Sequence, residues 1–160
     1  MATRGVFAAI LRQEKDDWPE ILLIQRAGKP DKTGYPKQWE LPGGRVEEGE
    51  TDEQCVMREV LEETGLQVKS LGVVSPELTA PAGVVTAQSD EAVVHFCEIV
   101  GGELKSFPTN DHLDAQWFTV DDLFSDEEVK VLTNPTSRGY VSRMMKMILS
   151  SFHAHDLRHK

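Results

Sequence analysis

The sequence predicts one mixed domain in which α-helices pack on a β-sheet. Residues 5–11, 21–25 and 91–100 are rich in strand-forming side chains. Between them lies a helical pattern of about 13 residues that starts at Thr51 and ends before Gly65. A chain of 160 residues suits one domain with its own core, which we place at residues 1–152, followed by a polar tail at 153–160.

Net charge limits the classes of partner. The chain has 17 basic and 27 acidic residues, a net charge of −10. Nucleic-acid polymers and anionic membranes require a basic surface, so the composition argues against both as general partners. It is compatible with a small phosphorylated substrate held through metal ions. A monomer and a homodimer both stay open.

Cysteine usage and hydropathy indicate the compartment. Cys55 and Cys97 lie far apart in the sequence, and two free thiols in a reducing compartment explain them better than a disulfide does. No apolar run approaches 18 residues, and the first residues lack the pattern of a signal peptide. We therefore expect a cytoplasmic protein without a membrane span.

The first two predicted strands, at residues 5–11 and 21–25, are joined by a short polar turn and are expected to pair. A loop of about a dozen residues follows at 26–37, a length that often has a function. Its lysines either contact phosphate or are ordinary solvated side chains: Lys29, Lys32 and Lys37. Arg26, at the start of this loop, is a candidate for substrate binding.

A tryptophan and two glycines precede the helix. Gly43 and Gly44 permit unusual backbone angles and a close approach of the backbone to other groups. Trp39 is either a core residue or part of the wall of a substrate pocket.

The helix itself is defined by its ends and its faces. Thr51 and Gln54 form a capping-box pattern, and Gly65 suits the left-handed residue that ends a helix. At 100° per residue, one apolar arc is expected to face the core; it contains Val56, Met57, Val60 and Leu61. A different face carries three carboxylates, with Arg58 beside them: Glu59, Glu62 and Glu63.

The carboxylates of this helix have two interpretations. Alone, three acids on one face indicate a solvated surface, although such a cluster of oxygen ligands is also what Mg²⁺ binds. The spacing favours the second interpretation, because seven positions of fixed residue type stand in one frame: Gly44, Glu50, Arg58, Glu59, Glu62, Glu63 and Gly65. At about 6% usage per residue type, this frame arises by chance about once in 10⁸ to 10⁹ positions.

The frame resembles the signature of the Nudix hydrolase family, G-x5-E-x7-R-E-U-x-E-E-x-G-U, where U is aliphatic. Val60 and Leu66 fill the two U positions, so residues 44–66 match throughout. The aromatic-x-x-Pro-Gly-Gly approach that begins at Trp39 is also widespread in that family. The resemblance implies an α/β/α sandwich around a mixed β-sheet, and an enzyme that cleaves a diphosphate linked to some other group X.

The resemblance also implies a divalent-metal site on the helix, with Mg²⁺ or Mn²⁺ as the ion. Its ligands would be the carbonyl of Gly44 and the carboxylates of the helix, Glu59, Glu62 and Glu63. One carboxylate would act as the general base, and which one does so differs between members. Arg58 would hold a carboxylate by a bidentate contact, and Glu50 would anchor the loop to the helix, which completes the candidate catalytic set.

A second acidic segment lies at residues 111–118. The family typically draws a further acidic side chain from a loop about six residues before a Trp, and Asp111, followed by His112 and Trp117, is the positional match. We therefore add Asp111 to the candidate metal ligands, although it is one methylene shorter than the Glu often found there. Asp114 is a candidate for substrate binding. Capping of turns explains both aspartates equally well.

The remaining elements follow from pattern. Residues 66–74 and 91–100 are predicted strands, and His95 in the second is expected to be a structural, hydrogen-bonded histidine. Gly101 and Gly102 form a two-residue hairpin signal, so a return strand is expected at 103–107. Trp117, Phe118 and Val120 predict a further short strand.

The C-terminal part of the chain is predicted to be helical. Residues 125–131 predict a short helix and residues 139–152 an amphipathic one. Its apolar stripe suits either the core or a dimer surface: Val141, Met144, Met145 and Ile148.

The resemblance leaves the group X open. The Trp39 approach, the Asp111 segment and the small size favour a (deoxy)nucleoside triphosphate, oxidised ones included, cleaved to a monophosphate and pyrophosphate. Pro81, 15 residues after Leu66, favours ADP-ribose or another nucleotide sugar. A regulator that binds a nucleotide without cleaving it is an alternative of another class. Such a domain is expected to tolerate loss of motif carboxylates, and all of them are present here.

Overall fold

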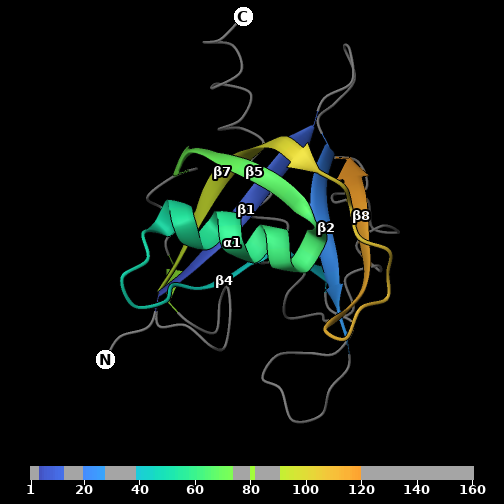
Figure 1. Cartoon of the computed structure of the whole chain (residues 1–160), viewed down its shortest axis with the longest axis horizontal. Helices are drawn as coiled ribbons and strands as arrows, with labels where there is room; N and C mark the ends of the chain where they lie inside the picture. The colour runs from blue at the N-terminus through green and yellow to red at the C-terminus, as the bar shows by residue number, and fades with distance from the viewer. Residues whose placement is uncertain (1–3, 13–19, 28–38, 74–79, 82–90, 120–160) are drawn as a thin grey trace, which may run out of the picture.

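The structure is a computed structural model that describes residues 4–12, 20–27, 39–73, 80–81 and 91–119 (Figure 1). These residues form eight strands and one helix: β1 Arg4–Arg12, β2 Glu20–Arg26, β3 Trp39–Glu40, β4 Gly43–Arg45, α1 Asp52–Thr64, β5 Leu66–Val73, β6 Ala80–Pro81, β7 Glu91–Gly102 and β8 His112–Thr119. The loop lysines, the C-terminal helices and the polar tail predicted from sequence lie outside the described residues.

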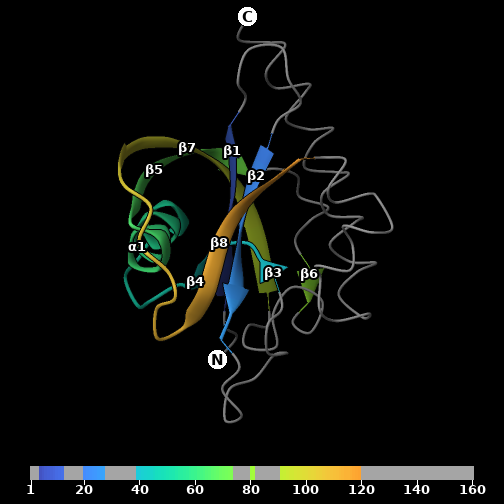
Figure 2. The ribbon, with the colours of Figure 1, turned by 90° about the vertical axis from the view of Figure 1, so that its right-hand side faces the viewer.

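The strands form one mixed sheet, as predicted. Its main path runs β3-β2-β1-β7-β5, while β4 pairs with β1, β6 with β7 and β8 with β2. β1 and β7 are parallel, and the other described pairs are antiparallel. Helix α1 lies on one side of this sheet (Figure 2). Within the described part of the chain, no helix has the length and apolar character needed to span a membrane.

The sheet divides where β1 and β2 take different partners. These strands pair at Leu11 with Ile21 and at Arg12 with Glu20. Elsewhere along their lengths β2 pairs with β3, and β1 pairs with β4 at Gly5, Val6 and Phe7. The sequence did not predict β3 or β4, and the chain between them crosses from one branch of the sheet to the other. This crossing sets the glycines beside α1.

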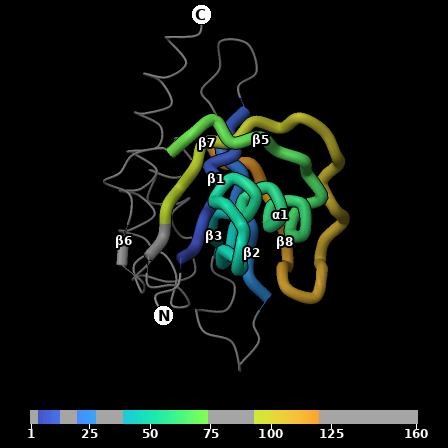
Figure 3. Tube along the Cα trace, turned by 60° about the vertical axis from the view of Figure 1, so that its left-hand side comes forward, coloured from blue at the N-terminus to red at the C-terminus, as the bar shows by residue number. Residues whose placement is uncertain are grey.

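Helix α1 begins and ends as the sequence predicts. The hydroxyl of Thr51 accepts from the backbone N–H of Gln54, and the Gln54 side chain accepts from the backbone N–H of Thr51, which completes the capping box. Gly65 takes the left-handed conformation, with φ 85°, and its N–H bonds to the carbonyl of Leu61. The chain then passes directly into β5 (Figure 3).

The buried face of α1 differs from the predicted arc. Val56 and Val60 are fully buried, but Met57 and Leu61 are 47% and 45% exposed. The face that meets the sheet instead includes Cys55, which is also fully buried. This rotation places residues 59 and 63 on the sheet side of the helix, because they lie between residues 55, 56 and 60 on the helical wheel.

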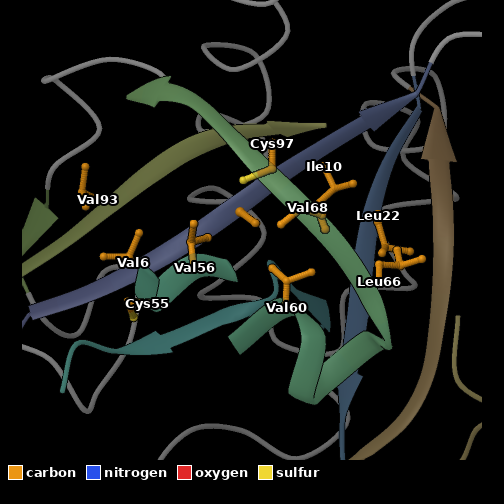
Figure 4. Packing of buried hydrophobic residues seen from close by; sticks show 11 residues of the cluster. Val6, Ile10, Leu22, Cys55, Val56, Val60, Leu66, Val68, Val93 and Cys97 are labelled. Atoms are coloured by element: carbon orange, nitrogen blue, oxygen red, sulfur yellow. The ribbon is translucent and has the colours of Figure 1, made fainter. Parts of the chain in front are cut away.

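One hydrophobic cluster joins α1 to the sheet (Figure 4). It contains Val6, Ala8, Ile10, Leu22, Cys55, Val56, Val60, Leu66, Val68, Val93 and Cys97. Each fully buried aliphatic side chain stabilises the fold by about 1.5–3 kcal/mol relative to exposure. The core therefore fixes the height and rotation of α1 over the sheet.

The predicted hairpin at Gly101 and Gly102 is wrong. β7 continues through both residues, which pair with Gln67 and Leu66 of β5, and residues 103–107 form no strand. A Cβ at Gly102 would lie 2.4 Å from the carbonyl oxygen of Gly65, so the glycine permits a close approach of two chains. β8 is longer than predicted, beginning at His112, whereas Val120 lies outside the described residues.

The histidine and cysteines of the core match their predicted roles. His95 is 2% exposed, and its Nδ1 lies 2.7 Å from the hydroxyl of Ser70. Cys55 and Cys97 are free and buried. Burial raises the pKa of both thiols to about 12, so neither is a reactive thiolate.

Candidate active site

The site is built where the two glycines meet the buried face of α1; we call Gly43 and Gly44 the glycine pair. The backbone N–H of Gly43 donates to Oε1 of Glu63 at 2.7 Å. A Cβ at Gly43 would lie 2.3 Å from the carbonyl oxygen of Val6, so glycine is required for this packing against β1. The glycine pair thus binds one carboxylate of the helix through its backbone.

The missing side chain of Gly44 leaves the space that the Glu59 carboxylate occupies. A Cβ on Gly44 would lie 2.5 Å from the carboxyl carbon of Glu59 and 2.6 and 2.8 Å from its two oxygens. The carboxylate therefore occupies the space that any other side chain at residue 44 would fill. The carbonyl of Gly44 faces the same helix, because the thiol of Cys55 donates to it at 3.5 Å.

Arg58 connects the loop between β4 and α1, residues 46–51, to the acidic side chains of the helix. Its guanidinium makes the bidentate contact expected from sequence, and the partner is Glu50, at 2.7 and 3.0 Å. Nη1 also donates to Glu59 at 2.9 Å and to Glu62 at 3.3 Å. Nη2 donates to the carbonyl of Arg45 at 3.0 Å. Arg58 therefore holds the loop, β4 and two predicted metal ligands together.

The carboxyl groups of the site have opposite pKa shifts. Burial raises the pKa of Glu63 well above its ordinary value, and the nearby carboxylates of Glu40 and Glu59 raise it further. Burial also raises the pKa of Glu59, against the influence of Arg58. The hydrogen bonds from Arg58 lower the pKa of Glu50 to about 2. Glu50 is thus a permanent partner of Arg58, whereas Glu59 and Glu63 lack a full counter-charge.

Three further side chains lie near Glu63, of which only Arg26 was predicted from sequence to belong to the site: His112, Glu40 and Arg26. His112 is 7% exposed, and its Nε2 lies 3.4 Å from Oε2 of Glu63 and 3.7 Å from Oε1 of Glu40. Glu40 in turn pairs with Nη1 of Arg26 at 3.3 Å. The available signals were positional: Glu40 follows Trp39, and His112 follows Asp111.

The predicted substrate contacts divide between the two faces of the sheet. Arg26 lies beside Glu40, on the face of α1. Trp39 is buried in an edge-to-face contact with Phe118, with ring centroids 5.1 Å apart. Because neighbouring residues in a strand point to opposite faces, Trp39 points away from the face that carries Glu40.

Asp111 and Asp114 lie on the β8 side of the site. Asp114 accepts from the backbone of Ala115 at 2.8 Å and from the side chain of Gln116 at 2.7 Å, and it stands opposite Gln25. The carbonyl of Asp111 accepts from the N–H of Ala27 at 2.9 Å. The Ala27–Asp111 bond and the pairing of Asp114 with Gln25 join the start of β8 to the end of β2, whereas the Asp114 side chain bonds only within β8. The proposed roles of both carboxylates stay predictions.

The donor set fits a hard divalent cation by its chemistry. Carboxylate and carbonyl oxygens are the ligands that Mg²⁺ and Mn²⁺ prefer, and a cation would offset the burial that raises the pKa of Glu59 and Glu63. Among the described residues, no three acidic, histidine or cysteine side chains converge on one point. In this arrangement Arg58 donates to Glu59 and Glu62, while the N–H of Gly43 donates to Glu63. Metal binding therefore requires these oxygens to share or leave their present partners.

Comparison with known families places the chain in a class. The model of the NUDIX domain matches residues 1–138. The chain therefore belongs to the NUDIX family, and the frame that begins at Gly44 is that family's motif.

Two curated relatives and one solved structure show how close the likeness is. The ADP-ribose pyrophosphatase of Methanocaldococcus jannaschii is 42% identical over 69% of this chain and 59% of its own length. A Mycobacterium tuberculosis protein named "Putative 8-oxo-dGTP diphosphatase 2" is 32% identical over 82% of this chain and 83% of its own length. The crystal structure of UDP-X diphosphatase superposes with a TM-score of 0.66 and 20% identity, covering 97% of this chain and 64% of that one, which shows the shared fold.

The chain spans a limited part of some relatives. It matches 59% of the length of the archaeal relative and 29% of another curated relative. These matches establish the family of the chain but not its activity or its substrate.

Proposed function

We propose that the chain is a Mg²⁺- or Mn²⁺-dependent hydrolase that cleaves the diphosphate linkage of a nucleotide derivative. One observation carries this proposal: Glu59 and Glu63 are partly buried side by side at the glycine pair, with side-chain exposures of 18% and 16%. Burying carboxylates without full counter-charges destabilises a fold, and apolar side chains would fill this position at no such cost. A pair of acids retained there is explained by a cation that they bind.

The metal would be held by the carbonyl of Gly44 and the carboxylates of Glu59, Glu62 and Glu63. When bound, a divalent ion neutralises phosphate oxygens and lowers the pKa of a coordinated water. Arg58 keeps Glu59 and Glu62 close together against their mutual repulsion, and Glu50 fixes the direction of Arg58. A carboxylate of this set also acts as general base toward the attacking water.

We place a (deoxy)nucleoside triphosphate, oxidised ones included, first among the substrates, with a monophosphate and pyrophosphate as products. The mycobacterial relative, which is named for 8-oxo-dGTP, supports this choice because its match extends over 83% of its length. ADP-ribose is the second candidate, supported by the 42% identity of the archaeal relative and by the position of Pro81. The cytoplasmic location and the monomeric or homodimeric state stay predictions.

A product analysis tests the proposal. The purified chain is incubated with nucleoside triphosphates, 8-oxo-dGTP, ADP-ribose, nucleotide sugars and dinucleoside polyphosphates, with Mg²⁺, with Mn²⁺ and with chelator. We expect metal-dependent release of pyrophosphate and a monophosphate from a triphosphate. AMP and ribose 5-phosphate from ADP-ribose would establish the second candidate. Binding without turnover on every compound would contradict an enzyme and favour a nucleotide-binding regulator.

A further inference from the structure

We propose that His112 is a positioning residue that fixes the orientation of the Glu63 carboxylate for metal binding. In this arrangement Glu40 contacts His112, and Arg26 pairs with Glu40. The inference rests on the proposed metal site and adds to it three residues that lie outside the family motif. It concerns the orientation of the Glu63 carboxylate in the metal-free site.

The geometry places one imidazole nitrogen between two carboxylates. Nε2 of His112 lies 3.4 Å from Glu63 and 3.7 Å from Glu40, on a side chain that is 7% exposed. The other oxygen of Glu63 accepts from the N–H of Gly43 at 2.7 Å. Glu63 is therefore contacted at both oxygens, by β4 on one side and by β8 on the other, which defines the plane of its carboxylate. Each oxygen retains a further lone pair for an ion.

The backbone around His112 is built to aim this side chain. The N–H of His112 donates to the hydroxyl of Thr109 at 3.1 Å, and its carbonyl accepts from the N–H of Thr109 at 2.8 Å. The register with β2 shifts here: Asp114 stands opposite Gln25, and His112 stands opposite Arg26. One extra residue in β8 forms a bulge, and such bulges re-aim side chains. As a result His112 shares a face with Arg26 and Glu63.

Electrostatics explains why a donor is needed at this point. Oε1 of Glu40 and Oε2 of Glu63 both face Nε2 of His112, so two carboxylates of like charge lie close together in a partly buried site. An imidazole N–H between them reduces this repulsion, and Arg26 compensates Glu40 from the far side at 3.3 Å. Without His112, Glu63 would be expected to turn away from Glu40 and to lose the orientation that Gly43 alone cannot fix.

The test is binding of Mn²⁺ alone to the full chain, followed by electron paramagnetic resonance without substrate. We expect His112→Ala to weaken Mn²⁺ binding by about tenfold or more, the size of effect usual for residues that orient metal ligands. His112→Gln places an amide N–H near the position of Nε2 and should restore binding close to that of the wild type. His112→Ala with no effect, or His112→Gln as weak as His112→Ala, would overturn the inference.

Two further variants separate positioning from packing. His95→Ala removes another buried histidine, which lies on β7 and bonds Ser70 of β5. This variant should have a lower melting temperature and an unchanged Mn²⁺ affinity. Glu40→Gln in the His112→Ala background should recover part of the lost affinity, since the repelling charge is gone. An equal loss of affinity in His95→Ala, or no recovery in the double variant, would contradict positioning by His112.

The outcomes also distinguish this inference from the proposed function. A wild-type chain that binds no Mn²⁺ and hydrolyses nothing would remove the metal site, and the inference with it. A wild-type chain that binds Mn²⁺ and turns over nucleotides, with His112→Ala indistinguishable from it, would overturn the inference alone.

Discussion

At the scale of single residues, the site depends on the absence of a side chain at Gly43 and at Gly44. The carboxylate of Glu59 fills the space where a side chain on Gly44 would lie, and the N–H of Gly43 meets Glu63. Neither glycine contributes a titratable or reactive side chain to these contacts. Backbone placement, rather than a further side chain, therefore brings the two acids together.

Gly44→Ala tests this placement. The new Cβ would lie 2.5 Å from the carboxyl carbon of Glu59, so Glu59 must move. We expect kcat/KM for the best substrate to fall about 10²-fold, as for displacements of about 1 Å in active sites. Gly49→Ala is the matched control, because its Cβ meets nothing within 4 Å but its φ of +80° still strains an alanine. Equal kcat/KM in Gly44→Ala and the wild type would contradict the placement.

At the scale of elements, α1 has two roles on one face. The arc that buries Val56 and Val60 also carries Glu59 and Glu63 toward the glycine pair. The capping residues predicted the ends of this helix, whereas sequence periodicity separated its apolar and acidic residues into different faces. It assigned Met57 and Leu61 to the core. The packed arc instead accommodates Glu59 and Glu63, because Arg58 and the backbone N–H of Gly43 donate hydrogen bonds to them. Periodicity contains no information about such distant partners.

The N-terminal cap of α1 is tested by Thr51→Ala. The variant loses the acceptor for the N–H of Gln54, a bond of 3.1 Å. We expect a loss of about 1 kcal/mol in the free energy of unfolding, or about 2–4 °C in melting temperature for a chain of this size. Thr51→Ser keeps the hydroxyl and should match the wild type in thermal denaturation. A melting temperature unchanged in Thr51→Ala would show that the cap contributes no stability.

At the scale of the whole molecule, the sheet was predictable where strands are long and patterned. β1, β2, β5 and the body of β7 follow their sequence signals. β3 and β4 have two and three residues, too few for any period, and they exist because β2 and β1 offer them edges. Gly101 and Gly102 suggested a turn, yet they serve the close packing of β7 on β5. The Glu40–His112 contact likewise depends on the shifted register of β8.

The partly buried acids Glu59 and Glu63 also set a balance between stability and function. Burial raises the pKa of Glu63 above its ordinary value of 4.5, so its contribution to stability is full below pH 4.5 and is lost as the pH rises through the raised pKa. In chelator at pH 8, Glu63→Gln should therefore be more stable than the wild type in urea denaturation, and the difference should vanish near pH 4. Mg²⁺ should stabilise the wild type and not the variant. A less stable Glu63→Gln in chelator at pH 8 would disprove this account of burial.

The most direct test of the central claim is calorimetric titration of Mn²⁺ into the wild type and into a chain with Glu59→Gln, Glu62→Gln and Glu63→Gln. These substitutions keep the shape of the side chains and remove the charges that would bind an ion. We predict saturable binding to the wild type and a loss of at least 100-fold in affinity in the variant. Equal affinity in the two chains would show that the acidic face of α1 is structural and that the metal, if one acts, is held elsewhere.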